Sequence, residues 1–214
     1  MHPGGIMISV RGKMARLPVT ETDTALWLAL NIQSVGLTDD QFIQLCSDNV
    51  DFRFEISAKK ELVIMPGTGP ETDIKNAEIT GQLWKWTKQD GTGVCFGSSA
   101  IFILPNGARR IPDGAWISKE RWNRFTPEEK SKLVVVCPDF VIELRSSSDQ
   151  LRPLQAKMEE YIENGARLAW LLDPIDNCAT IYRPGQSPEW IENPTIISGD
   201  PVLPGFRFDF REIL

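Results

Sequence analysis

Hydrophobic positions along the chain follow the period of a strand in some segments and that of a helix in others. FRFEIS and ELVIMP, residues 52–57 and 61–66, flank a short polar link, which predicts a hairpin. Residues 73–88 place apolar side chains on two opposite faces of a helix, which predicts a helix buried on both sides. A single apolar stripe along residues 152–164 predicts a second long helix.

Further apolar segments predict the strands of a sheet. Residues 94–107 predict two strands separated by a kink, and residues 108–116 predict a third strand that contains Asp113. LVVVCPDFVIEL, residues 133–144, is the most strongly apolar segment of the chain. Runs of this kind are typical of a strand covered on both faces, so we place it at the centre of the sheet.

The order strands, helix, strands, helix, strands predicts one α/β domain whose mixed central β-sheet is flanked by helices. Residues 23–47 predict two short helices that cover an edge of the sheet, the second capped by Thr38 or Asp39. We therefore divide the chain into residues 1–37, an N-terminal extension with the first helix, and residues 38–214, the domain itself.

The composition of the chain restricts the class of protein to which it can belong. No apolar stretch approaches the ~20 residues of a membrane-spanning helix, and the N-terminus lacks a secretion leader, which predicts a cytoplasmic protein without a membrane partner. The net charge of −6 argues against broad attraction to nucleic acid, although 23 lysines and arginines leave room for a local basic cleft.

Cysteine and histidine usage restricts the chemistry further. The four cysteines form no close pair, which argues against a zinc knuckle, a redox dithiol and a disulfide framework. A single histidine, His2, excludes histidine triads and sites with several histidine ligands. Any metal chemistry must therefore use oxygen ligands.

Two carboxylates interrupt the most apolar strand. Alternation along it puts Asp139, Val141, Glu143 and Arg145 on one side. A buried carboxylate without a partner costs several kcal/mol, so Glu143 needs a cation, a metal ion or water. Glu143 lies near the end of the strand, whereas Asp139 lies four residues earlier and is more easily explained as structural.

Hydrolysis of a phosphodiester requires the residue types found here. Two acidic residues at the ends of neighbouring strands can hold Mg²⁺, and a nearby lysine can orient or activate the attacking water. Asp113 and Glu143 are the pair that we choose, since the stretch between them is long enough to connect paired strands.

Blocks of sequence around these residues resemble a known superfamily. RIPDGAWI (110–117), PDFVIELRSSSD (138–149) and KMEEYIENGARLAWLLDP (157–174) resemble the successive motifs of the PD-(D/E)XK nucleases. Within that superfamily the chain is similar to the Uma-type group of restriction-endonuclease-like bacterial proteins, including the closing VLPGFRFDFREIL. The resemblance covers about residues 38–214 and implies a restriction-endonuclease-like fold.

The resemblance also implies roles for individual residues. Asp113 and Glu143 become ligands of Mg²⁺ (or Mn²⁺), and Glu78 a possible auxiliary acid. A lysine is usual two residues after the glutamate, but Arg145 stands there, and an arginine is a poor general base. In the Uma-type group the lysine comes from the following helix, which offers Lys157, and helix geometry lets its amine reach back towards Glu143.

The leading hypothesis is therefore a Mg²⁺-dependent endonuclease that hydrolyses DNA phosphodiester bonds. A catalytically inactive scaffold of the same fold, binding a partner or nucleic acid, is the alternative that the acidic charge and Arg145 favour. A closed, narrow pocket would instead indicate a hydrolase of a small phosphorylated compound. The sequence leaves open whether Arg145 contacts phosphate or neutralises Glu143, and whether two copies form a homodimer.

Overall fold

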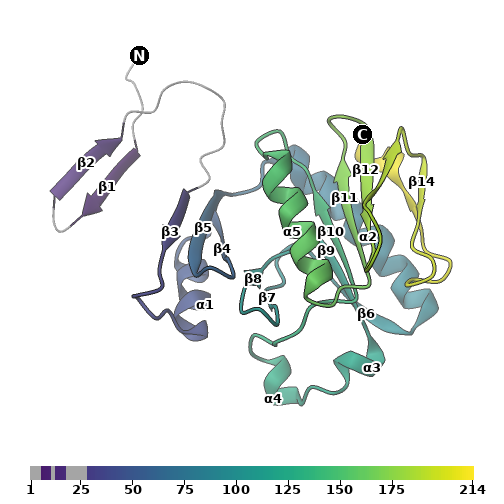
Figure 1. The fold of residues 1–214 in the computed structure, drawn as a ribbon, viewed down its shortest axis with the longest axis horizontal. Helices are drawn as coiled ribbons and strands as arrows, with labels where there is room; N and C mark the ends of the chain where they lie inside the picture. The colour runs from purple at the N-terminus through teal and green to yellow at the C-terminus, as the bar shows by residue number, and fades with distance from the viewer. Residues whose placement is uncertain (1–5, 11–12, 18–27) are drawn as a thin grey trace.

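A six-stranded mixed sheet forms the centre of the computed structural model, which describes residues 6–10, 13–17 and 28–214 (Figure 1). Its strand order is β13-β12-β11-β10-β9-β6, in which β10 and β11 run parallel and all other neighbours antiparallel. The predicted mixed sheet with its most apolar strand inside is confirmed. The strands are β6 (Gly93–Phe96), β9 (Gly114–Ser118), β10 (Phe140–Leu144), β11 (Leu168–Asp173), β12 (Cys178–Tyr182) and β13 (Glu189–Glu192).

A second, antiparallel sheet of five strands has the order β3-β5-β4-β8-β7. Its β4 and β5 form the predicted hairpin. Helix α1 packs on this sheet, because Phe42 joins a buried cluster with Phe54 and Ile56. The elements are β3 (Leu28–Asn31), α1 (Asp39–Asp48), β4 (Phe52–Ile56), β5 (Glu61–Pro66), β7 (Phe102–Ile103) and β8 (Arg109–Arg110).

Two long helices, α2 (Pro70–Asp90) and α5 (Leu151–Glu163), cover opposite faces of the six-stranded sheet (Figure 1). Phe140 and Ile142 of β10 belong to the buried cluster that includes α2 side chains. Val141 belongs to the cluster that includes α5 side chains. The predicted alternation along this strand is therefore confirmed, and Glu143 shares the α5 side with Val141.

Short elements complete the fold. The N-terminal strands β1 and β2 pair with each other, and so do the C-terminal strands β14 and β15. In the part of the chain that the structure describes, no helix is long and apolar enough to cross a membrane. The bounds are β1 (Ile6–Val10), β2 (Lys13–Leu17), α3 (Lys119–Trp122), α4 (Pro127–Lys130), β14 (Ile196–Ser198), β15 (Arg207–Asp209) and the 3₁₀ helix η1 (Phe210–Ile213).

The prediction of two helices over residues 23–47 is wrong for the first helix, as far as the structure describes those residues. Residues 28–31 form the edge strand β3, and residues 23–27 lie outside the described part. A short apolar run fits either element, and pairing with β5 decides the outcome. The second helix is confirmed as α1, with Thr38 as its N-cap.

The strands predicted over residues 108–116 and 133–144 are each divided between the two sheets. Residues 109–110 pair in the five-stranded sheet and residues 114–118 in the six-stranded one, so Asp113 lies in the link and not within a strand. Likewise Val136 donates its N–H to Ile103 of the five-stranded sheet, whereas β10 begins only after Pro138, which lacks an N–H to donate.

Substitutions of two glycines test this packing. A Cβ on Gly93 would lie 2.1 Å from the buried Trp116 ring, so we expect Gly93→Ala to lower the free energy of unfolding by about 2 kcal/mol. Gly81 lies within α2 with open space around it, so Gly81→Ala should raise that free energy by about 0.5–1 kcal/mol. Urea unfolding measures both, and a Gly93→Ala protein as stable as the wild type would contradict the packing of β6 against β9.

Candidate active site

Strand register brings Asp113 and Glu143 together. Strands β9 and β10 pair Gly114 with Ile142, and the same register continued by one residue sets Asp113 opposite Glu143. Opposite residues on antiparallel strands have Cβ atoms about 4.5–5.5 Å apart. The Leu144 N–H also donates to Asp113 Oδ2 at 2.9 Å, which fixes the aspartate at this end of β10. Two carboxylates from adjoining chain segments therefore converge, and both are buried.

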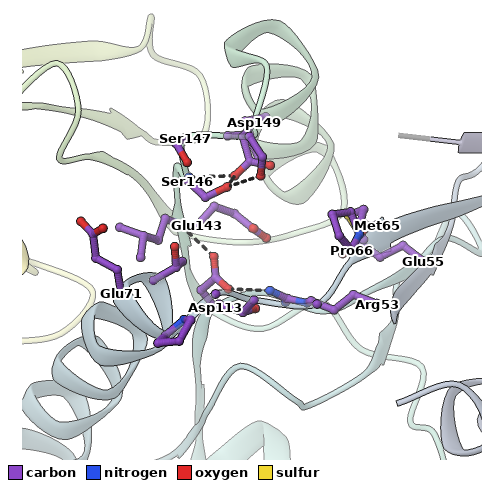
Figure 2. Close-up of a pocket in the computed structure, with 18 of the residues that line it drawn as sticks. Arg53, Glu55, Met65, Pro66, Glu71, Asp113, Glu143, Ser146, Ser147 and Asp149 are labelled. Carbon is purple, nitrogen blue, oxygen red and sulfur yellow. Dashed lines mark hydrogen bonds and ion pairs between the residues drawn. The ribbon is translucent and has the colours of Figure 1, made fainter. Parts of the chain in front are cut away.

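They line a pocket of about 280 Å³ where the two sheets meet (Figure 2). Strand β4 contributes Arg53 and Glu55 to the pocket, and α5 contributes Lys157. The remaining walls come from residues 65–72, which lead into α2, and from the serine-rich residues 146–149 before α5.

Lys157 lies between two carboxylates. Its Nζ is 2.8 Å from Glu143 Oε1 and 2.7 Å from Glu55 Oε1. The structure thus brings together Asp113, Glu143 and Lys157, three of the residues singled out from the sequence. The lysine comes from α5, as the Uma-type resemblance implies.

Glu55 is a member of the site that the sequence reasoning missed. It is buried, and besides Lys157 it accepts hydrogen bonds from Arg110 Nη1 at 2.8 Å and from the Ile111 N–H at 3.0 Å. Alternation in FRFEIS places Glu55 on the other face of the strand from the buried Phe54 and Ile56. From the sequence alone, that face looks like the solvent-exposed side of a hairpin. The sequence offered one signal for Glu55, namely an acidic residue between apolar neighbours in a predicted strand.

Arg53 holds Asp113 from the side of β4. Its Nη1 donates to Asp113 Oδ1 at 3.1 Å (Figure 2), and its Nη2 donates to the Ile111 carbonyl at 3.0 Å. With the Leu144 N–H on the other oxygen, both oxygens of Asp113 accept a hydrogen bond. The orientation of this carboxylate is therefore fixed by the protein.

Glu143 keeps one oxygen open to the pocket. Its Oε1 accepts a hydrogen bond from the Tyr161 hydroxyl at 2.9 Å and contacts Lys157. Its Oε2 accepts none from the residues that the structure describes, although the side chain lines the pocket. An oxygen in this position can serve as a ligand for a cation or accept a hydrogen bond from water.

The buried charges shift one another's pKa values. Burial raises the pKa of Glu143 to about 7, opposed by Lys157 and assisted by the negative charges of Asp113 and Glu55. Burial alone would raise the pKa of Glu55, but the charges of Lys157 and Arg110 outweigh it and lower that pKa to about 2. Burial alone would lower the pKa of Lys157, but Glu143 and Glu55 raise it above its ordinary value. Lys157 is therefore a cation at neutral pH.

The donor set fits a hard divalent cation. In residues 6–10, 13–17 and 28–214, no group of three or more His, Cys, Asp or Glu side chains is arranged to hold a metal ion. Mg²⁺, however, is often bound through only one or two carboxylates, with water and substrate phosphate completing its shell. Asp113 and Glu143, with the open Oε2, match that mode of binding.

Two further residues singled out from the sequence lie elsewhere. Arg145 donates to Asp173 and to Asp176, each at 2.6 Å, so these residues and not Glu143 are its acidic partners. Glu78 shares a face of α2 with Gln82, whose side chain bonds the backbone of Asp209 near the C-terminus. Neither Arg145 nor Glu78 is among the residues that line the pocket.

Asp139 has a structural environment. Its carboxylate accepts hydrogen bonds from the Ser118 N–H and from Arg121 Nη1, both at 2.8 Å. It lies buried just before β10, at the end of the strand opposite Glu143. The structural interpretation made from the sequence agrees with these contacts.

Comparison with known proteins gives a family and a fold. The model of the Uma2 family, described as "Putative restriction endonuclease", matches residues 39–211. The fold is similar to that of "a putative nuclease belonging to DUF820" from Anabaena variabilis, with a TM-score of 0.67 and 18% sequence identity over 82% of this chain and 96% of that one. Among the curated proteins, the comparison found no match.

The lowered pKa of Glu55 predicts how stability depends on pH. Its ionised form is favoured by folding, so its contribution of about 3 kcal/mol is present above about pH 5 and is lost as the pH falls towards about 2. We expect the difference in the free energy of unfolding between wild type and Glu55→Gln to shrink by about 2 kcal/mol from about pH 6 to about pH 3.

Chemical denaturation at both pH values measures this difference. Glu163→Gln, which removes an exposed carboxylate at the end of the same helix as Lys157, is the control and should show little change with pH. A constant difference between wild type and Glu55→Gln would mean that Glu55 is not held as an anion by its buried cations.

Proposed function

The chain belongs to the Uma2 family, and we propose that it is a Mg²⁺-dependent endonuclease that hydrolyses DNA phosphodiester bonds. One observation carries the proposal: Asp113 and Glu143 line the same pocket, with the Lys157 ammonium 2.8 Å from Glu143. Two acidic ligands and a fixed cation are the groups that metal-assisted attack on a phosphodiester requires.

The charge of the pocket supports dependence on a metal ion. Its cationic lining residues are Arg53 and Lys157, and both already contact carboxylates. Its lining carboxylates are Glu55, Glu71, Asp113, Glu143 and Asp149. An anionic phosphate is repelled by such a pocket unless a cation enters with it.

Each residue then has a task. Asp113 and Glu143 would hold Mg²⁺, which when bound supplies Lewis-acid polarisation of a phosphoryl oxygen. Lys157 stays protonated between its carboxylates, so it orients the attacking water or stabilises charge on the phosphate by donating a hydrogen bond, and does not take a proton from water. Arg53 and Tyr161 keep the two acids in place.

One observation favours a second candidate, a protein of nuclease fold that binds DNA without cutting it. Both oxygens of Asp113 already accept hydrogen bonds, from Arg53 and from Leu144. A metal ion must then share an Asp113 oxygen with Arg53 or with the Leu144 N–H, or displace the guanidinium. The two candidates differ in whether the protein binds a divalent ion.

Plasmid nicking tests catalysis. With Mg²⁺ or Mn²⁺ we expect the wild type to nick plasmid DNA, and Asp113→Asn and Glu143→Gln to reduce the rate at least about 100-fold because each removes a charged ligand. Glu163→Gln, at an exposed carboxylate, should keep the wild-type rate. Absence of nicking by the wild type at high enzyme concentration would contradict the proposal.

Calorimetric titration with Mn²⁺ separates the two candidates. The endonuclease should bind Mn²⁺, and Asp113→Asn or Glu143→Gln should weaken binding at least about tenfold, since each removes an anionic ligand. A folded wild-type protein that binds no Mn²⁺ would favour the scaffold that does not cut.

A further inference from the structure

A second pocket, of about 470 Å³, lies on α2 beside the candidate active site. Its lining residues on the helix run from Asp73 to Trp84 and recur every three or four positions, so they form one face of α2. The opposite wall is the loop of residues 97–99, which follows β6. Its small residues, Ala77, Gly81 and Gly97, leave room for a flat group.

A buried amide in this pocket lacks a partner. Asn76 is 3% exposed, and its Oδ1 accepts no hydrogen bond from the described residues. Leaving such a group without a partner is costly, and because Asn76 lines the pocket, a ligand or a water molecule there can supply one. A carboxamide offers both donors and an acceptor, which matches the hydrogen-bonding edge of a nucleobase.

An aromatic ring lies exposed on the same face. Trp84 lines the pocket with 52% of its surface exposed, an unusual position for the largest apolar side chain. Nearby, Lys88 Nζ lies 5.5 Å from the ring centroid, and Lys85 is also exposed. An exposed indole flanked by lysines is the combination with which proteins stack a base and hold its phosphate.

The second pocket is joined to the acidic pair by one side chain. Arg53 donates from Nη2 to the Ser98 carbonyl at 3.4 Å and from Nη1 to Asp113 at 3.1 Å. The helix provides a second link, since Thr72 lines the first pocket and Asn76, one turn later, lines the second. A nucleotide strand whose phosphate lies at Asp113 therefore has this pocket within reach of a neighbouring base.

We propose that this pocket binds a nucleobase of the DNA strand next to the cleaved bond, stacked on Trp84 with its edge hydrogen-bonded to Asn76. The inference rests on the proposed function and adds a preference to it. A base in this pocket is unstacked and unpaired, and extracting it from a duplex costs a few kcal/mol. The protein therefore favours single-stranded or locally unpaired DNA over an intact duplex.

Binding without cleavage tests the pocket. Fluorescence anisotropy with Ca²⁺ in place of Mg²⁺ compares a labelled 12-nucleotide single strand with the duplex of the same sequence. Stacking contributes about 1–3 kcal/mol per base, so Trp84→Ala should weaken binding of the single strand about 10-fold and binding of the duplex much less. Gly81→Leu fills the pocket from an open position in the helix and should have the same effect. Trp190→Ala, at a tryptophan that is 60% exposed and outside the pocket, is the matched control and should bind both as the wild type does.

The outcomes separate the inference from the function. Wild-type affinity for the single strand in both Trp84→Ala and Gly81→Leu would overturn the proposal that this pocket binds a base. Equal losses of affinity for the single strand and the duplex would also overturn it. If a deoxymononucleotide binds as tightly as the single strand, the pocket is a site for a free nucleotide, and the proposal of a base in a DNA strand is again overturned. Failure of the wild type to nick DNA with Mg²⁺ or Mn²⁺ would refute the proposed function alone, because the binding experiments measure affinity and not cleavage.

Discussion

The position of the Lys157 ammonium between Glu55 and Glu143 is the interaction on which the site depends. Both carboxylates are buried and the Lys157 side chain is 10% exposed, and a buried charge is tolerated only when it is paired. Glu55 comes from the five-stranded sheet, Glu143 from the six-stranded sheet and Lys157 from the helix that covers it. The triad therefore fixes three parts of the fold against each other, and removing the Lys157 charge would leave Glu143 without its ion-pair partner.

The division of two strands between the sheets makes room for this arrangement. The chain leaves the five-stranded sheet after Arg110 and enters the six-stranded sheet at Gly114. The link between them supplies the Ile111 N–H to Glu55 and the carboxylate of Asp113 to Arg53. The crossing leaves the Ile111 N–H free to bind Glu55, because regular strand pairing would have used it in a backbone hydrogen bond.

The sequence predicted correctly those residues of the site that follow from a local pattern or from the order of motifs. Alternation along β10 assigned Glu143 to the correct face, and the resemblance to the Uma-type group pointed to Lys157, whose reach to Glu143 helix geometry allowed. It missed Arg53 and Glu55, because their partners lie 60 and 102 residues away and a hairpin pattern does not say what covers its polar face. The sequence likewise placed Arg145 beside Glu143, because it does not show which distant residues approach that arginine. In the structure its acidic partners are Asp173 of β11 and Asp176 of the turn after it. The strand β3 was mistaken for a helix since four residues carry too little periodicity.

The protonation state of Lys157 tests the account most directly. Two carboxylates within hydrogen-bonding distance should keep its amine charged, with a pKa above the ordinary lysine value of about 10.4. NMR of ¹⁵N-lysine-labelled protein, assigned with Lys157→Arg and followed through a pH titration, measures that pKa. The account predicts an ammonium signal that persists past the titration of the exposed lysines. Titration of Lys157 near neutral pH would contradict the buried charge triad and would make the lysine a general base instead.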